Sequence, residues 1–404
     1  MILIMAWRNI WRNKLRSLVI ILSVALGLFA GLMVLSIYKG MLRGRVRTVI
    51  DSEVSHIQIH DSNFKKDYDP IYIITQSDEL IKALKKNQDI KSFSVRSITQ
   101  GMLSATTGSA GVQINGVLPL EENIVSQLAK KIKIGNGFTD HKKNEILIGK
   151  KLAKKLKLKL GGKIVLTITD TSAEIVSGVF RIVSIFESEN APLDEINVYV
   201  KKDALDEMLG TTNQIHEIAI RLNSDELLGA TVQQIQKQFK QYQIETWEAL
   251  SPETVLMVDT IDITSYIIIG IILFALAFGI INTMLMAILE RTKEIGMMMA
   301  LGLNKIKLFQ LILLETIFLT TIGTPLGLGM AWGLTNYYHQ NGLHWESMSK
   351  ELMSSFGFST TIYPEFPFEK IGISMCFVML TAILSCIYPA IKALHLQPVD
   401  ALRK

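Results

Sequence analysis

The chain is poor in the residues and motifs on which many enzymes depend. Only two cysteines occur among 404 residues, and both, Cys376 and Cys386, lie in the last apolar run. No disulfide framework can therefore form outside that run, and we expect both to pack as small apolar residues. Gly161-Gly162-Lys163 lacks the G-x-x-x-x-G-K spacing of a phosphate-binding loop, and neither an H-E-x-x-H motif nor a nucleophile elbow occurs. These absences argue against an ATP-hydrolysing or protease site in this chain.

The net charge is also small, at +5, and no basic stripe with interleaved aromatic residues occurs, so we expect no nucleic-acid partner. The chain is instead rich in apolar residues, which make up 49% of it. They gather in four runs of about 20 residues or more, the length that a membrane span requires. The composition predicts an integral membrane protein and not a soluble enzyme.

The four apolar runs predict four transmembrane helices, at residues 18–38, 265–289, 308–334 and 371–391. At about 1.5 Å per residue, each can cross a hydrocarbon core of about 30 Å. A cleaved signal peptide is the alternative for the first run. That run is longer than the usual apolar region of about 7–15 residues, however, and no A-x-A cleavage site follows it.

Residues 39–264 have a different character, because they are charged and contain no apolar run long enough to cross a membrane. Ser77–Asn87 has the spacing of an amphipathic helix, and Glu145–Thr169 has the pattern strand, helix, glycine turn, strand. Further strands are predicted at 54–59, 179–187 and 197–200, and a helix at 227–239. The predicted fold class is an α-helical membrane protein with four transmembrane helices and a large extracytoplasmic mixed α+β domain inserted between helices 1 and 2.

Two histidines share one face of the first predicted strand, where His56, Gln58 and His60 alternate with isoleucines. At strand spacing the two histidines are about 13 Å apart, which is too far to bind one zinc ion. We expect a solvated strand face and no metal site. A metal-dependent or catalytic outer domain is the alternative, and it would rest on these two histidines alone.

The distribution of charge predicts the orientation in the membrane. The basic residues after the first span balance those before it, so the charges at its two ends do not decide its orientation. The segment 290–307 and the tail 392–404 are basic, whereas 335–370 carries four glutamates and two lysines. The positive-inside rule therefore places 290–307 and both termini in the cytoplasm, and the large domain and the loop 335–370 outside. Residues 1–17, with basic residues among tryptophans, predict a cytoplasmic interfacial amphipathic helix.

The segment 290–307 joins the second span to a short polar helix without a turn signal. Its charges must leave the lipid, because each charge at the bilayer centre would cost roughly 2.5–3.5 kcal/mol. Apolar residues then recur near helical spacing, so the helix can lie along a surface. The residues of this pattern are Glu290, Arg291, Lys293, Glu294, Ile295, Met298, Met299 and Leu303.

This segment and both ends of the chain resemble the ABC-transporter permeases of the FtsX-like superfamily, which includes lipoprotein-releasing permeases of the LolC/LolE type and macrolide-export permeases of the MacB type. The resemblance rests on Asn282–Gly302, on the N-terminal AWRNIWRNKLRS and on the C-terminal PAIKALHLQPVDALR. In that family the middle segment is a cytoplasmic coupling helix that docks on a separate ATPase. The resemblance assigns ATPase coupling to Glu290, Arg291, Glu294, Ile295, Gly296, Met299, Ala300 and Gly302.

The resemblance implies a transporter subunit of the bacterial inner membrane, with its large domain in the periplasm. It implies no catalytic residue, metal or cofactor on this chain, and places ATP and Mg²⁺ on a partner ATPase dimer. Four spans are few for enclosing a substrate, so a second permease copy or paralogue is expected. Mechanotransmission to the periplasmic domain would release lipoproteins or another amphiphile. The alternatives are MacB-like efflux and a transmembrane regulator of a cell-wall hydrolase, which usually has a smaller outer domain.

Small residues inside the spans indicate close helix packing. Gly27 and Gly31 form a small-xxx-small pattern, and glycines surround a proline in the third span. Glu315 is the only carboxylate inside an apolar run, and the alternatives for it are a functional intramembrane group and a structural helix contact. Transmembrane packing is predicted for Gly27, Gly31, Asn282, Glu315, Gly323, Pro325 and Gly327.

One stretch departs from the lipoprotein-releasing pattern. In permeases of the LolC type, an extended hairpin with proline and arginine recruits a periplasmic carrier. The stretch that would align with it, Asp170–Gly178, is short and has neither residue. This stretch therefore does not predict that this chain recruits a periplasmic carrier or adaptor, and the partner permease is the alternative place for its binding.

Overall fold

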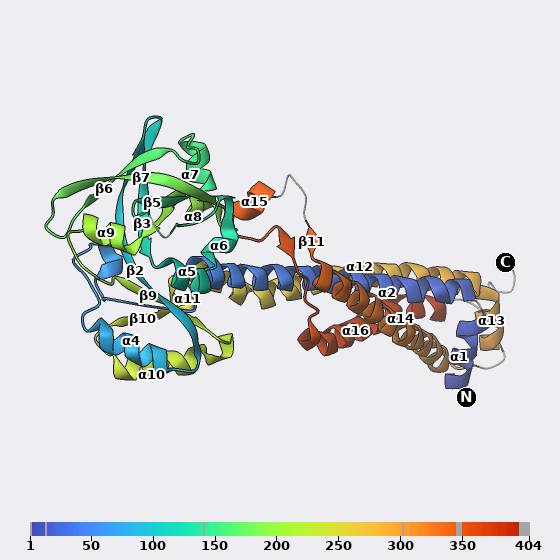
Figure 1. Ribbon diagram of the computed structural model, residues 1–404. Helices are drawn as coiled ribbons and strands as arrows, with labels where there is room; N and C mark the ends of the chain where they lie inside the picture. Colours follow the sequence, from blue (N-terminus) through green and yellow to red (C-terminus); the bar gives the residue numbers. More distant parts are fainter. Residues whose placement is uncertain (1, 13, 140–141, 301–302, 345–349, 396–404) are drawn as a thin grey trace. The chain divides into compact units, whose positions relative to one another are not determined.

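The computed structural model describes residues 2–12, 14–139, 142–300, 303–344 and 350–395, which form two compact units (Figure 1). The membrane unit contains the described residues of Met1–Leu42, Asp259–Leu343 and Thr361–Lys404. The α/β unit contains those of Arg43–Val258 and His344–Thr360.

Among the described residues, four helices are long and apolar enough to cross a membrane, in agreement with the four predicted spans. They are α2 (Lys14–Thr48), α12 (Pro252–Glu290), α14 (Lys305–Asn341) and α16 (Ile371–Leu394). The membrane unit also contains the short helices α1 (Ile2–Arg12) and α13 (Thr292–Ala300). The strands β11 (Leu343–His344) and β12 (Thr361–Ile362) pair, and a 3₁₀ turn (Phe368–Lys370) precedes α16.

Two of the long helices continue beyond the spans that we predicted for them. We expected the large domain to occupy 39–264, but α2 continues to Thr48 and ends in a π-helical turn, Val49–Glu53, while α12 already begins at Pro252. Few helix breakers oppose this, since Gly40 and Gly44 are the only glycines or prolines between Leu32 and Asp51. Both helices therefore pass from one unit into the other as continuous helix.

The α/β unit is built on a mixed sheet with the order β10-β1-β9-β2-β3-β8-β5-β7-β4, and β6 pairs with β2 and β7. Its strands, within the described residues, are β1 (Ile57–His60), β2 (Ile90–Ala105), β3 (Gly108–Val117), β4 (Ile132–Gly135), β5 (Glu145–Gly149), β6 (Lys163–Thr169), β7 (Ile175–Phe186), β8 (Asn197–Lys201), β9 (Glu217–Leu222) and β10 (Gln243–Thr246). Its helices are α3 (Phe64–Asp67), α4 (Ser77–Lys86), α5 (Pro119–Val125), α6 (Leu128–Lys131), α7 (Lys150–Lys155), α8 (Ala191–Ile196), α9 (Lys202–Met208), α10 (Leu228–Gln238), α11 (Trp247–Leu250) and α15 (Lys350–Ser355), and Asp225–Leu227 form a 3₁₀ turn.

The sheet has two lobes with separate hydrophobic cores. In the first lobe, the chain order β1-α4-β2-β9-α10-β10 and the antiparallel sheet order β10-β1-β9-β2 are those of a split βαβ fold. Its core contains Ile59, Leu80 and Ile218, all fully buried. The second lobe is inserted between β2 and β9, and its core contains Ile114 and Phe180.

The local predictions in the α/β unit hold where amphipathic spacing was strong. The helix predicted at Ser77–Asn87 is α4, and Glu145–Thr169 forms β5, α7 and β6 as expected. The prediction that one face of the first strand is solvated was wrong. His56, Gln58 and His60 are all buried, although they lie on the face of β1 that was expected to be solvated.

Polar partners compensate the burial of both histidines. His56 Nε2 lies 2.9 Å from Asp225 Oδ1, and His60 Nε2 lies 2.8 Å from Glu245 Oε2. Lys65 also donates to Glu245, at 3.0 Å. Each buried ring is therefore held by a carboxylate from another element, which strand spacing alone does not reveal.

Candidate coupling site

The predicted coupling segment forms a separate helix after a one-residue break. The helix α12 ends at Glu290, and Arg291 N–H donates to the carbonyl of Ile288 at 3.2 Å, a tight turn that allows the chain to change direction. The helix α13 then begins at Thr292. Asn304 caps the following helix α14, since its side chain accepts a hydrogen bond from Ile306 N–H at 3.2 Å.

The two faces of α13 differ in burial. Ile295 and Gly296 are buried, and Met298 and Met299 pack against the hydrophobic core of the membrane unit. The opposite face carries Lys293, Met297 and Ala300, exposed at the helical spacing i, i+4, i+7. We call these three residues, together with the exposed Glu290 at the end of α12, the exposed stripe.

The predicted coupling residues divide between these faces. Glu290 and Ala300 lie on the exposed stripe, and Glu294 is half-buried. Arg291, Ile295 and Gly296 are instead buried inside the membrane unit, and their role in ATPase coupling stays a prediction. Gly302 lies outside the described residues.

Sequence reasoning left Lys293 and Met297 out of the coupling set. Both lie on the exposed stripe, and the Met297 side chain is 50% exposed. Their spacing from Ala300 is the signal that would have identified them, because residues three and seven positions before Ala300 lie on the same helical face.

A buried ion cluster joins three helical segments behind α13. Arg16 at the start of α2 pairs with Glu315 of α14, and Arg291 Nη1 donates to the same carboxylate oxygen at 3.3 Å. Arg291 Nη2 also donates to the Asn9 carbonyl of α1, at 3.3 Å. Arg12 of α1 pairs with Glu294 at a more exposed position. Breaking a buried ion pair costs about 3–5 kcal/mol, so this cluster fixes α13 against α1 and α14.

The glycines predicted to pack lie at close helix contacts. A Cβ on Gly323 would lie 2.9 Å from the Ile21 carbonyl oxygen of α2, and one on Gly327 would lie 2.6 Å from that of Ala25. Toward α12, a Cβ on Gly27 or Gly31 would meet Leu276 at 3.2 Å or Ile272 at 2.9 Å. The absence of side chains at these positions allows the three helices to approach one another.

The other predicted packing residues lie differently. Glu315 is buried in the ion cluster, whereas Asn282 and Pro325 are exposed on the surface of this single chain. Cys386 is buried as expected of a packing residue, but Cys376 is exposed.

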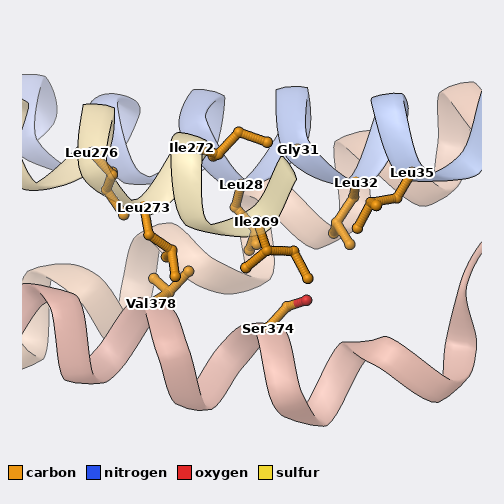
Figure 2. Close-up of a pocket in the computed structure, with 10 residues that line it drawn as sticks. All are labelled: Leu28, Gly31, Leu32, Leu35, Ile269, Ile272, Leu273, Leu276, Ser374 and Val378. Carbon is orange, nitrogen blue, oxygen red and sulfur yellow. The ribbon is translucent and has the colours of Figure 1, made fainter. Parts of the chain in front are cut away.

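A small cavity of about 20 Å³ lies beside Gly31, between α2, α12 and α16 (Figure 2). Leucines and isoleucines line it, and the hydroxyl of Ser374 points toward Ile269. Among the described residues, the buried Ser374 Oγ has no hydrogen-bond partner.

Polar contacts hold the end of α2 within the α/β unit. Arg221 donates to Asp51 Oδ1 at 2.6 Å, and Lys131 Nζ donates to the Ser52 carbonyl at 3.3 Å. Burial lowers the pKa of the Lys131 amine to about 8. The remaining contacts join Thr48 to Glu189 and Glu53 to both Arg45 and Asn190. We call this set the tether, because four of its contacts connect the end of α2 and the π-helical turn to the rest of the α/β unit. The Arg45–Glu53 pair holds the turn against α2 itself.

Four apolar helices, a short helix between the second and third of them, and a mixed α/β unit define a class of multi-span membrane proteins with a large domain. Two family models match this chain. The MacB-like periplasmic core domain matches residues 17–238, and the FtsX-like permease C-terminal domain matches residues 266–398. The chain belongs to the FtsX-like superfamily of ABC-transporter permeases, which confirms the family predicted from the sequence.

Relatives match along nearly the whole chain. The "Uncharacterized ABC transporter permease YknZ" of Bacillus subtilis is 24% identical, and the alignment covers 99% of this chain and 98% of the relative. The "Lipoprotein-releasing system transmembrane protein LolC" of Neisseria meningitidis serogroup B is 21% identical, with 96% and 94% covered. A solved periplasmic region of MacB from Actinobacillus actinomycetemcomitans is similar at 14% identity and a TM-score of 0.36, over 51% of this chain and 94% of that structure.

Proposed function

We propose that this permease couples ATP hydrolysis on a cytoplasmic ATPase dimer to movement of its α/β unit in the periplasm, and that this movement releases lipoproteins from the bacterial inner membrane. The complex contains a second permease copy or paralogue. In this proposal the chain is not an enzyme. ATP and Mg²⁺ bind the ATPases, and this chain binds no cofactor of its own.

The observation that carries the proposal is the continuity of α2 and α12 between the two units. Both remain helical where a flexible linker would dissipate a displacement. The tether supports the same reading at the far end of α2. Arg221 of β9 donates to Asp51, and Asn190 at the start of α8 donates to Glu53, so a displacement of α2 acts on the sheet domain.

At the other end, the exposed stripe of α13 supplies the contact with the ATPase. It carries one acidic, one basic and two apolar residues, a composition suited to a protein contact with a polar rim. The buried ion cluster holds α13 from behind, so a movement of the ATPase reaches α14 through Glu315.

The substrate assignment rests on the likeness to the lipoprotein-releasing relative, which extends over almost the entire chain. One observation favours a second candidate, the MacB-like efflux of another amphiphile. Strands β6 and β7 form a regular hairpin whose turn, Asp170–Glu174, contains neither proline nor arginine. A carrier that recognised those residues would have to bind the partner permease instead.

The ATPase contact is tested with Lys293→Glu and Met297→Asp on the exposed stripe. Both should insert normally but lose most ATPase copurification and substrate-stimulated hydrolysis, because a charge is reversed or an apolar contact is removed. Lys392→Glu is the matched control, an exposed lysine at the end of α16. Wild-type ATPase binding by both stripe variants would remove α13 from the coupling site.

The lever is tested by replacing Arg43, Val46 and Arg47 of α2 with glycine in one variant and with alanine in another. Both variants lose the same side chains, but glycine costs about 1 kcal/mol per residue relative to alanine in a helix. The glycine variant, with Gly44 already present, should hydrolyse ATP yet release several-fold less lipoprotein per ATP. Equal release per ATP by the two variants would leave the α/β unit as a static binding platform.

A further inference from the structure

A cavity of about 420 Å³ opens in the membrane unit where α1, α12, α13 and α14 meet. Apolar side chains form one part of its wall, among them Met284, Ile288 and Leu311. Three arginines, two glutamates and Asn9 form the rest, and one of the arginines, Arg16, comes from α2. Its volume lies within the range of about 300–1,000 Å³ that is usual for ligand sites.

The buried part of this wall has an excess of positive charge. Arg16 and Arg291 are about nine-tenths buried, and both pair with the carboxylate of Glu315. Arg291 Nε also lies 3.9 Å from Glu294 Oε2, which is beyond hydrogen-bond distance. Among the described residues, the Nε atoms of both arginines are buried without a hydrogen-bond partner. Buried charges are normally paired and buried donors normally satisfied. Two buried guanidinium groups beside one buried carboxylate, with two Nε donors that have no hydrogen-bond partner, are the features of an anion site.

The remaining charged pair leaves this excess unchanged. Arg12 and Glu294 also line the cavity, and they pair with each other at its more exposed side. Three guanidinium groups thus face two carboxylates, and a bound anion with one negative charge would balance the wall.

We propose that this cavity binds the phosphate group of an anionic phospholipid, with the glycerol part of the lipid against the apolar wall. A guanidinium group matches phosphate geometry through paired N–H donors. Inorganic phosphate would satisfy the arginines but would leave the apolar wall exposed to water. Basic pockets between transmembrane helices are known to take lipid headgroups.

The surroundings of the cavity also favour a lipid. The helix α1, which contributes Arg12, carries Trp7 and Trp11 exposed on its surface. Tryptophans on an amphipathic helix anchor at the headgroup level of a bilayer. The opening of the cavity therefore lies at the depth where lipid phosphates are found. The lipid would fill the space behind α13 and hold the exposed stripe in position, a role that goes beyond the proposed transport.

Native mass spectrometry of the full chain in detergent tests the site with three probes, which are phosphatidylglycerol, phosphatidylcholine and inorganic phosphate. The wild-type chain should bind one phosphatidylglycerol at least tenfold more tightly than phosphatidylcholine. In Arg16→Gln this preference should fall about tenfold, the loss expected for one charge-assisted hydrogen bond. This variant should fold, because Arg291 still balances Glu315.

Two exposed arginines on α1 give a matched comparison that does not depend on the buried cluster. Arg12→Gln should weaken phosphatidylglycerol binding about fivefold, because Arg12 lines the cavity. Arg8→Gln removes the same charge from the same helix outside the cavity, and should leave the preference unchanged. Glu315→Gln should strengthen binding, because it increases the positive excess.

Equal losses in the Arg8 and Arg12 variants would overturn the proposal, since binding would then be a general surface attraction. Inorganic phosphate that binds at millimolar concentration, without any preference among lipids, would overturn the lipid assignment. Weaker binding in Glu315→Gln as well as in Arg16→Gln would show that the cluster only maintains the fold, and would also overturn it. Loss of ATPase coupling in Lys293→Glu would not affect any of these readouts, because Lys293 does not line the cavity, whereas Met297 does.

Discussion

The membrane unit and the α/β unit differ in how they combine apolar packing with charge. Along α2, contacts with α12 and α14 occur at glycines, and the buried ion cluster of Arg16, Arg291 and Glu315 lies at one end of the unit. The α/β unit instead buries charge within its sheet. Arg96 of β2 lies between Glu122 and Glu217, at 2.7 and 2.8 Å.

The difference follows from the surroundings of each unit. Lipid is as apolar as a leucine side chain, so helices in a membrane associate through close contacts between small residues and not through hydrophobic burial. In the α/β unit, two separate apolar cores supply the hydrophobic energy, and the buried ions lie in polar layers beside them. Substitutions that disturb helix packing should therefore lower stability most in the membrane unit. Substitutions that remove one partner of a buried ion pair should lower it most in the α/β unit.

The largest effect is expected from Arg96→Met, which would leave two buried carboxylates without their shared cation. We expect the α/β unit to lose about 3–5 kcal/mol of stability. This loss is measured by unfolding the full chain in detergent with a chemical denaturant, with the susceptibility of the α/β unit to proteolysis as the readout. Lys143→Met is the control, because its pair with Glu207 is exposed and screened by solvent, so its loss should have little effect on stability. Equal losses of stability in both variants would mean that the buried ion pairs of Arg96 stabilise the unit no more than an exposed pair does.

A smaller effect, with a defined pH window, is expected at Lys131 of the tether. Burial lowers the pKa of this amine from its ordinary 10.5 to about 8. Between these values the unfolded chain binds more protons at this position than the folded chain, so stability rises with pH, by at most about 3 kcal/mol. Thermal unfolding between pH 7.5 and about 10.5 should show this rise in the wild-type chain and a flatter profile in Lys131→Met. Parallel profiles would mean that Lys131 is solvated in the folded chain.

The sequence predicted the architecture where local patterns were strong. Uncharged runs predicted the apolar helices α2, α12, α14 and α16, and amphipathic spacing predicted α4. Motifs at three separate segments identified the superfamily. These features succeed because spans and amphipathic helices are properties of consecutive residues.

The polar contacts of the site could not be predicted in the same way. Glu315 pairs with a residue 299 positions away, and the burial of Arg291 depends on where α1 lies. His60 was misjudged for the same reason, since its partner Glu245 lies in β10, 185 positions away. A single sequence gives the period of each element but not the partner that faces it, so the orientation of α13 had to come from the structure.

Gly327→Ala tests whether close contact between α2 and α14 stabilises the membrane unit. The added Cβ would lie 2.6 Å from the Ala25 carbonyl oxygen, so α2 and α14 must separate, at a cost of about 1–3 kcal/mol. Gly329→Ala is the matched control on the same helix, since a Cβ there meets none of the described residues within 4 Å. The control should be neutral or slightly stabilising, because alanine is the better helix former. Thermal unfolding in detergent compares the two, and equal transition temperatures would mean that α2 and α14 separate easily.

The smallest effect is expected from Ser374→Ala, and its sign is the informative part. The hydroxyl of Ser374 is buried beside an apolar cavity of about 20 Å³, with no partner among the described residues. A single water could fit there, but it would need two to four polar neighbours, and the remaining lining residues are leucines, isoleucines, a glycine and a valine. Removing the hydroxyl should therefore stabilise the chain by less than about 1 kcal/mol.

Ser36→Ala provides the opposite case on α2. Its buried hydroxyl donates to the Leu32 carbonyl at 2.6 Å, so the substitution removes a satisfied hydrogen bond and should destabilise by about 0.5–1 kcal/mol. The two serines thus share their burial and the membrane setting, and differ only in whether the hydroxyl has a partner. Thermal unfolding of both variants in the same detergent should give shifts of opposite sign. Destabilisation by both would show that the Ser374 hydroxyl is satisfied after all, and that the cavity beside it is not dry.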